Sequence, residues 1–327
     1  MELPFELRTA IEKQTEGMSV SKMKRISEEL SRRYREKSGR GKVLLSEEAE
    51  AAVYSAVRMP ATFGAVFSAL DYVLEIVDLK AATLLDVGAG TGAAAWAADA
   101  LMELDTVTCL EREAAMQAVG KSMMQYGSPV LKEAKWISGD LISDDILQAD
   151  LIIASYVLNE LLGENFLGVL DKLWQAAGEL LLIVEPGTPQ GHKRLRMARE
   201  YLISKGADIA APCPHNAECP MTWGLDWCHS TCRIPRSRLH RQLKEGEVPY
   251  EDEKFSYMAF VKEQTKKVPA RILRHPYMGK GYVSLEVCSI AGIEKAVVQK
   301  KEKDFYKKAR KAKCGDSIEL PKRAYER

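Results

Sequence analysis

The sequence contains no run of about 18 or more apolar residues, the length that a membrane-spanning helix needs. Its first residues, MELPFELRTAIEKQTEG, include Glu2, Glu6 and Glu12. Signal peptides begin with a cationic stretch followed by an apolar run, and transit peptides are poor in acids. We therefore expect a cytoplasmic protein with no membrane segment.

The composition also lacks a strong bias. Hydrophobic residues make up 46% and charged residues 28%, with a formal net charge of +1, so neither a disordered chain nor a disulfide scaffold is the expected class. A length of 327 residues suits two domains, or one domain with extensions. In reduced cytoplasm, clustered cysteines indicate a metal or catalytic site more often than disulfides.

The chain begins with a helical region. Amphipathic or acid-started segments predict helices over residues 7–17, 19–37, 46–58 and 63–77, with Pro60 interrupting the pattern. From Thr83 onward, short apolar runs alternate with helical stretches: TLLDVG, TVTCLE, KWIS, DLIIASYV and ELLLIVEP. Strands that alternate with helices favour an α/β fold with a parallel sheet covered on both faces.

Two later runs, KFSYMAFVK and GYVSLEVCS, have no convincing helix between them, so we expect them to extend the same sheet in antiparallel fashion. The predicted organisation is a helical region over 1–78 and a nucleotide-binding α/β domain over 79–327. Within that domain we place a cysteine-rich insertion at about 206–250 and a basic segment at about 293–327. A monomer is the default expectation.

A glycine-rich loop follows the first predicted strand, in LLDVGAGTGAAAWAA. Gly88, Gly90 and Gly92 permit a tight turn and close backbone approach, and the helix that follows offers free N–H groups to a ligand. Counted through Ala93, the same letters also fit the dinucleotide pattern G-x-G-x-x-G/A. The loop alone therefore leaves the nucleotide open.

Three acids favour S-adenosylmethionine (SAM). Asp86, two residues before the first glycine, resembles the first motif of Rossmann-like class I SAM methyltransferases, in which the acid lies near the amino-acid end of the cofactor. Glu111 ends the second strand, where a carboxylate can accept hydrogen bonds from ribose hydroxyls. Asp140 follows the third strand, where that family contacts the adenine amine.

No catalytic residue can be assigned. The fourth strand is followed by SYVLNEL rather than by the Asn/Asp-Pro-Pro-aromatic signature of amino-group methylation. Asn159, Glu160 and Glu185 are candidates for a role near the methyl group, although a polar pair that starts a helix is the commoner interpretation of Asn159 and Glu160. Whether the chain is an enzyme stays open.

Four of the seven cysteines lie in one loop, APCPHNAECPMTWGLDWCHSTCR. Cys213, Cys219, Cys228 and Cys232 are separated by five, eight and three residues, which is not the paired C-x-x-C of a zinc ribbon. Thiolates suit both zinc and iron-sulfur clusters. A metal-binding insertion is therefore expected, with the metal undecided.

Several motifs in one order, IVEPGTP, APCPH, DWCH, RSRLHR and YEDEKFSY, resemble the methyltransferase-like assembly factors of the mitochondrial small ribosomal subunit and their bacterial and archaeal relatives. The resemblance implies SAM binding and a structural [4Fe-4S] cluster. By motif, its ligands would be Cys213, Cys219, Cys228 and Cys288, with Cys232 as an alternative fourth ligand and zinc as an alternative metal. His215 and His229 would lie beside the ligands.

Two basic groups agree with a ribosomal RNA partner. The segment 295–313 holds nine basic residues against Glu302 and Asp304. A second group follows the cysteine loop: Arg233, Arg236, Arg238, Arg241 and Lys244. Clustered Lys and Arg are typical of phosphate-backbone contacts, although a solvated helix face is equally common.

The predicted function is that of a SAM-binding protein in small-subunit assembly that binds rRNA. Three alternatives stay open: an active SAM-dependent rRNA methyltransferase, a zinc-bearing RNA-binding module without catalysis, and, more remotely, an NAD-dependent dehydrogenase.

Overall fold

The computed structural model describes residues 2–37, 45–161, 163–244, 248–321 and 324. The chain forms two compact units, each drawn from three segments. The first comprises Met1–Asp71, Leu79–Glu185 and Cys232–Glu253. The second comprises Tyr72–Asp78, Pro186–Thr231 and Lys254–Arg327. The helices before residue 71 and the glycine-loop region therefore share one unit.

The N-terminal helices are α1 (Phe5–Gln14), α2 (Val20–Lys37), α3 (Glu48–Val57) and α4 (Met59–Leu74). Helix α4 begins before Pro60 rather than after it. Proline is tolerated in the first turn of a helix because the N–H that it lacks has no partner there. Helices α1 and α3 pack against α6 (Ala114–Met124). The N-terminal helices thus pack against the helical layer of the first unit.

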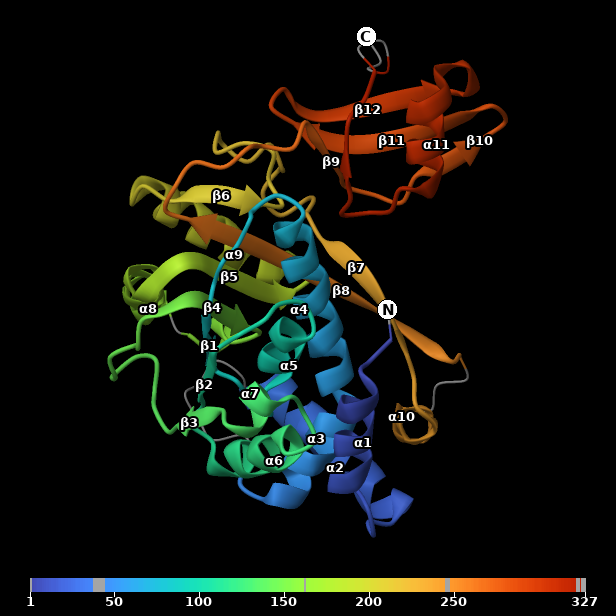
Figure 1. Cartoon of the computed structure of the whole chain (residues 1–327). Coiled ribbons are helices and arrows are strands. Elements are labelled where there is room, and N and C mark those ends of the chain that lie inside the picture. The colour runs from blue at the N-terminus through green and yellow to red at the C-terminus, as the bar shows by residue number, and fades with distance from the viewer. Residues whose placement is uncertain (1, 38–44, 162, 245–247, 322–323, 325–327) are drawn as a thin grey trace. The chain divides into compact units, whose positions relative to one another are not determined.

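The five predicted strands of the first unit are confirmed as β1 (Thr83–Val87), β2 (Thr106–Leu110), β3 (Lys135–Ile137), β4 (Ala149–Ser155) and β5 (Ala177–Pro186). They run parallel in the order β3-β2-β1-β4-β5 (Figure 1). Leu84 of β1 pairs with Val107 on one side and Leu151 on the other. The fold is mixed α/β with a doubly wound parallel sheet.

The connecting elements of this unit are α5 (Ala93–Asp99), α6, α7 (Pro129–Lys132), the 3-10 helix η1 (Leu158–Glu160), α8 (Gly163–Ala176) and α10 (Arg238–Lys244). The chain winds from β1 toward β3 in one direction and from β4 toward β5 in the other. In such sheets, ligands bind outside the carboxyl ends of the strands where the direction switches, here β1 and β4.

The second unit contains α9 (Pro189–Ser204), β6 (Asp208–Ala211) and most of β8 (Tyr250–Val261), and β6 runs antiparallel to β8. Strand β7 (Ser230–Pro235) also pairs with β8. A five-stranded sheet follows with the order β10-β11-β9-β13, and β12 pairs with β11. Its strands are β9 (Ala270–Ile272), β10 (Tyr277–Gly279), β11 (Tyr282–Ser289), β12 (Gly292–Gln299) and β13 (Ser317–Ile318).

The expectation that GYVSLEVCS extends the parallel sheet is wrong, because β11 belongs to this second sheet. The reason is a separate core: one face of β11, with Val283, Leu285 and Val287, packs on Ala309 of helix α11 (Lys303–Lys311). Figure 1 shows α11 lying along these strands. The basic segment is therefore part of a folded β-sheet with its own covering helix. Within the described ranges, no helix is long and apolar enough to cross a membrane.

Candidate functional site

The glycine loop has the backbone that its sequence predicts. Gly88, Gly90 and Gly92 have φ values of 64°, 56° and 87°, in the left-handed region that favours glycine. The Gly88 N–H donates a 2.8 Å hydrogen bond to the main-chain oxygen of Leu110. A Cβ at Gly88 would lie 2.6 Å from Cγ2 of Val157, so both conformation and space require glycine there.

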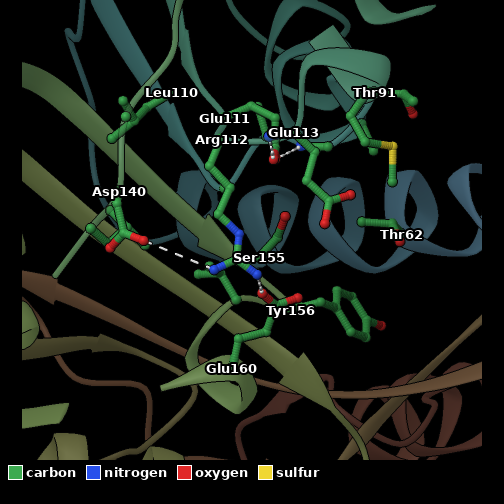
Figure 2. Close-up of a pocket in the computed structure, with 18 of the residues that line it drawn as sticks. Thr62, Thr91, Leu110, Glu111, Arg112, Glu113, Asp140, Ser155, Tyr156 and Glu160 are labelled. Atoms are coloured by element: carbon green, nitrogen blue, oxygen red, sulfur yellow. Dashed lines mark hydrogen bonds and ion pairs between the residues drawn. The ribbon is translucent and has the colours of Figure 1, made fainter. Parts of the chain in front are cut away.

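A cavity of about 120 Å³ opens beside this loop, at the carboxyl ends of β1, β2 and β4. Figure 2 shows part of its polar wall, in which the guanidinium of Arg112 lies between Asp140 and Glu160. The predicted residues Gly88, Gly90, Glu111 and Asp140 all line it. Tyr54, Met59 and Thr62 of the N-terminal helices also line it, which no local motif indicated.

Asp86 lies behind the loop, fully buried. Its Oδ2 accepts a 3.1 Å hydrogen bond from the N–H of Ala95 in α5, and Oδ1 has no hydrogen-bond partner among the described residues. Burial raises the pKa of this carboxyl to about 7, although the Ala95 N–H opposes the shift. Asp86 therefore anchors the start of the helix that follows the glycine loop.

Glu111 binds backbone on both sides. Its Oε2 accepts a 2.8 Å hydrogen bond from the N–H of Gly90, and Oε1 accepts one of 2.8 Å from the N–H of Glu113. Each carboxylate oxygen has two lone pairs, so both oxygens keep capacity for a further donor. The acid at the end of β2 thus shapes the loop while facing the cavity.

Arg112 lies between two acids of the cavity wall. Its guanidinium is 3.3 Å from Oε2 of Glu160 and 3.9 Å from Oδ2 of Asp140. Burial raises the pKa of the Glu160 carboxyl to about 7, although Arg112 opposes the shift. Glu160 is therefore the acid of this wall that can hold or release a proton near neutral pH.

The other two candidates from the sequence lie differently. Asn159 and Glu185 do not line the cavity, and Oε1 of the fully buried Glu185 accepts a 3.0 Å hydrogen bond from the N–H of Leu158. Glu185 therefore supports the turn after β4 from below. Of the three sequence candidates, only Glu160 faces the cavity.

Tyr156, at the carboxyl end of β4, was not singled out by the sequence. Its φ is 57°, an uncommon value for a bulky residue, and such residues cluster at functional sites. The hydroxyl donates a 2.9 Å hydrogen bond to Oε1 of Glu253. Burial raises the pKa of this phenol well above its usual range, so it stays protonated. No local pattern could have predicted this left-handed tyrosine.

The second unit holds a separate cavity of about 50 Å³. Four thiols line it: Cys213, Cys219, Cys228 and Cys288. The first three come from the loop after β6 and the fourth from β11. Cys232 lies instead in the first unit, where Ser68 and Glu253 are its polar neighbours. The structure thus groups Cys288, rather than Cys232, with the three loop cysteines.

Burial raises the pKa of the thiols of Cys213, Cys228 and Cys288, and for Cys288 the value is about 12. The other thiols add to the shifts because thiolates repel one another. The Nε2 of His215 lies 3.9 Å from Sγ of Cys288. Among the described residues, no three His, Cys, Asp or Glu side chains converge closely enough to hold one metal ion.

Two buried arginines brace the loop around this cavity. Arg199 of α9 donates a 3.1 Å hydrogen bond to the main-chain oxygen of His215 and also binds that of Ala217. Arg271 of β9 donates from Nε to the main-chain oxygen of Pro212 at 2.9 Å. These hydrogen bonds hold the backbone of the loop in a segment whose described residues form no regular helix or strand between β6 and β7.

The remaining cysteines are structural. Cys109 is fully buried within β2, as its apolar surroundings predicted. Cys314 donates from Sγ to the main-chain oxygens of His229 at 3.3 Å and Leu273 at 3.2 Å.

The basic group after the cysteine loop is partly neutralised. Glu251 forms ion pairs with Lys244 at 2.8 Å and with Arg236 at 3.5 Å, and Asp252 forms one with Arg233 at 2.7 Å. These pairs reduce the charge available for phosphates. In the segment 295–313, by contrast, most lysines are exposed to solvent.

Among solved structures, the chain is similar to a magnesium protoporphyrin IX methyltransferase from Synechocystis with bound SAM, at 13% identity, a TM-score of 0.41, and coverage of 79% of this chain and 97% of that one. It is also similar to the plantazolicin methyltransferase BpumL with bound SAH, at 12% identity, a TM-score of 0.43, and coverage of 75% and 98%. Because both TM-scores are below 0.5, the assignment of the fold rests on the strand order of the parallel sheet and not on these similarities.

Among curated proteins, the human mitochondrial ribosome assembly protein METTL17 is 28% identical over 291 residues, which cover 81% of this chain and 62% of the relative. Two mitochondrial Rsm22-cox11 tandem proteins of Schizosaccharomyces pombe are 29% identical over 217 residues, covering 52% of this chain and 29% of each relative. The match thus spans less than two thirds of these relatives. A family model described as mitochondrial small ribosomal subunit Rsm22 matches residues 48–319, and the chain therefore belongs to the Rsm22 family.

Proposed function

We propose that this chain is a SAM-binding, methyltransferase-like factor that acts in assembly of the small ribosomal subunit, contacts its rRNA, and holds a [4Fe-4S] cluster through Cys213, Cys219, Cys228 and Cys288. The observation that carries the proposal is the grouping of these four thiols around one cavity, in a chain of a family whose human relative is named a ribosome assembly protein.

The donor set fits a cluster better than a single ion. One zinc ion draws four ligands to a single point, with Zn–S distances of about 2.3 Å. The four thiolates of a [4Fe-4S] cluster bind four separate irons and stay further apart. No three described donors converge on one point here, yet four cysteines face one cavity. When bound, the cluster would supply a rigid crosslink between its four ligands.

The crosslink would join two segments that lie far apart in the chain. Cys213, Cys219 and Cys228 lie in a loop, whereas Cys288 lies on a strand of the five-stranded sheet. A cluster bound by all four cysteines would fasten the loop to the sheet. Metal binding contributes on the order of 10 kcal/mol to the folding of such segments. The cluster's role is therefore structural.

The pocket beside the glycine loop supports SAM binding by the first unit. Left-handed glycines let a ligand approach the backbone, and Glu111 presents carboxylate oxygens at the end of β2. Asp86 lies behind this pocket rather than in it, so its proposed role is to position the loop and α5.

One observation favours the second candidate function, an active rRNA methyltransferase. Glu160 faces the same pocket, and its pKa of about 7 suits a group that accepts a proton during methyl transfer. Transfer of a radiolabelled methyl group from SAM to small-subunit rRNA, lost in Glu160→Gln, would support this function.

The metal is tested on protein purified without oxygen, by measuring iron, acid-labile sulfide and zinc together with the visible spectrum. We expect about four irons and four sulfides per chain, which is the content of the cluster named. Cys288→Ser should lose both, while Cys232→Ser and the buried control Cys109→Ser should keep them.

Stoichiometric zinc without sulfide would contradict the cluster and support the zinc-bearing RNA-binding alternative. Loss of iron in Cys232→Ser but not in Cys288→Ser would overturn the ligand set. The cytoplasmic location stays a prediction, since the named relatives are mitochondrial proteins.

A further inference from the structure

Two tyrosines stand on the solvent side of the hairpin formed by β10 and β11. Tyr277 is 64% exposed and Tyr282 is 36% exposed. Their ring centroids are 6.3 Å apart, with an angle of 45° between the ring planes. Exposed aromatic rings held side by side on a sheet are uncommon, because burial of each ring would stabilise the fold.

The register explains why the rings meet. Tyr277 is opposite Ser284, and Gly279 is opposite Tyr282, so both rings stand on the same face as diagonal neighbours. The Tyr282 ring lies across Gly279, where an added Cβ would be 2.3 Å from ring atoms. Glycine at position 279 therefore leaves room for the ring of Tyr282 to lie flat on the sheet.

The opposite face of the hairpin is already filled. Val283, Leu285 and Val287 alternate with the exposed positions and pack beneath α11. The core of the sheet therefore does not need Tyr277. Cys288 shares a face with Tyr282 because the two are an even number of residues apart, so the thiol and the rings occupy the same side of β11.

Three exposed lysines lie in the segments next to this hairpin. Lys280 is exposed in the turn of the hairpin. Lys300 and Lys301 are exposed in the 3-10 helix η2, and the N–H of Lys300 donates a 2.8 Å hydrogen bond to the main-chain oxygen of Gly281 in that turn. The acid Glu302 of the same 3-10 helix keeps its negative charge, and its carboxylate accepts the N–H of Gln299 at 2.6 Å.

We propose that Tyr277 and Tyr282 form a stacking platform for unpaired bases of RNA, with Lys280, Lys300 and Lys301 beside the phosphates. Exposed aromatic rings and adjacent lysines are the combination that binds single strands, because every base has a π-face and every nucleotide a charge. The inference rests on the proposed function in taking RNA as the partner, and it deepens that function by naming the surface and the single-stranded form.

Fluorescence anisotropy with a labelled, unstructured RNA of about 12 nucleotides tests the platform, on the full chain with its iron content measured in parallel. Loss of stacking on one base corresponds to a loss of about 5-fold to 150-fold in affinity, so Tyr277→Ala with Tyr282→Ala should weaken binding by at least about fivefold. Tyr277→Phe with Tyr282→Phe keeps the rings and should stay within about threefold of the wild type. Gly279→Ala should weaken binding by displacing Tyr282.

Two controls separate stacking from folding and charge. Tyr126→Ala changes a tyrosine that is 38% exposed in the other unit and should leave RNA binding unchanged. A duplex RNA of equal length offers no unpaired bases, so the double alanine variant should bind it as the wild type does.

Unchanged binding of the single strand by the double alanine variant would overturn the platform, as would an equal loss in the double phenylalanine variant. Wild-type protein that holds iron and sulfide yet binds no single-stranded RNA would also overturn it, while leaving the cluster proposal intact. If the protein lacks the cluster but binds single-stranded RNA, and the double alanine variant alone loses that binding, only the proposed metal would be overturned.

Discussion

The hydroxyl of Tyr156 donates a 2.9 Å hydrogen bond to Oε1 of Glu253, which lies 97 positions later in the chain. This bond joins the carboxyl end of β4, beside the glycine-loop cavity, to β8. Burial raises the pKa of the Glu253 carboxyl, and the Tyr156 hydroxyl opposes that shift. The pair therefore stabilises both a partly buried acid and a left-handed backbone residue beside the site.

Removal of this hydrogen bond should destabilise the protein. Tyr156→Phe leaves the partly buried carboxyl of Glu253 without that donor, so the free energy of unfolding should fall by about 1–3 kcal/mol. Urea denaturation in a double-mutant cycle with Glu253→Ala should give a coupling energy above about 0.5 kcal/mol. The exposed control Tyr126→Phe should stay within about 0.5 kcal/mol of the wild type. Strictly additive effects in the cycle would contradict the coupling.

The glycine loop should not tolerate a side chain at its first position. Gly88→Ala forces alanine to a φ of 64° and places a methyl group 2.6 Å from Cγ2 of Val157. The variant should lose about 1–3 kcal/mol of stability and bind SAM at least tenfold more weakly by calorimetry.

Gly168→Ala is the matched control for this change. Gly168 is exposed in α8 with open space around it, and alanine favours a helix by about 0.5–1 kcal/mol. Wild-type SAM affinity in both alanine variants would contradict the proposed role of the loop.

The carboxyl of Glu111 should hold the loop through two backbone contacts. Glu111→Gln keeps one acceptor oxygen and loses one of the bonds to Gly90 and Glu113, whereas Glu111→Ala loses both. The free energy of unfolding should therefore fall in steps of about 1 kcal/mol from wild type to glutamine to alanine. SAM affinity should fall in the same order. Equal stability of the two variants would show that the backbone contacts do not carry the effect.

Asp86 should make stability depend on pH. The pKa of this carboxyl is about 7 in the folded protein and 3.8 in the unfolded chain, so between these values the folded state keeps a proton that the unfolded chain releases. Its contribution to stability is thus fully present below about pH 4 and is lost as the pH rises through about 7. Asp86→Asn removes this loss and can still accept the N–H of Ala95.

The measurement is urea unfolding of both proteins across that pH range. The variant should gain stability relative to the wild type as the pH rises, by up to a few kcal/mol. A difference between the two proteins that stays constant with pH would refute the assignment.

Much of the first unit follows from local sequence. The runs around Leu84 and Leu151 are apolar because parallel strands are buried on both faces, so each strand could be recognised alone. The loop glycines were equally readable, because a left-handed backbone selects glycine over short range. Pro60 was expected to interrupt the helical pattern between two helices, whereas it lies in the first turn of α4, where a helix tolerates proline.

The sequence by itself therefore determined the parallel strands, the glycine loop and a cysteine-rich segment, all of which depend on residues close together in the chain. Only the tertiary structure decided which thiols share a cavity, with Cys288 beside the loop and Cys232 in the other unit. It also decided that β11 joins a separate sheet and that Tyr156 takes a left-handed backbone. Such choices depend on packing between segments distant in sequence, where spacing and local propensity carry no information about which partners meet.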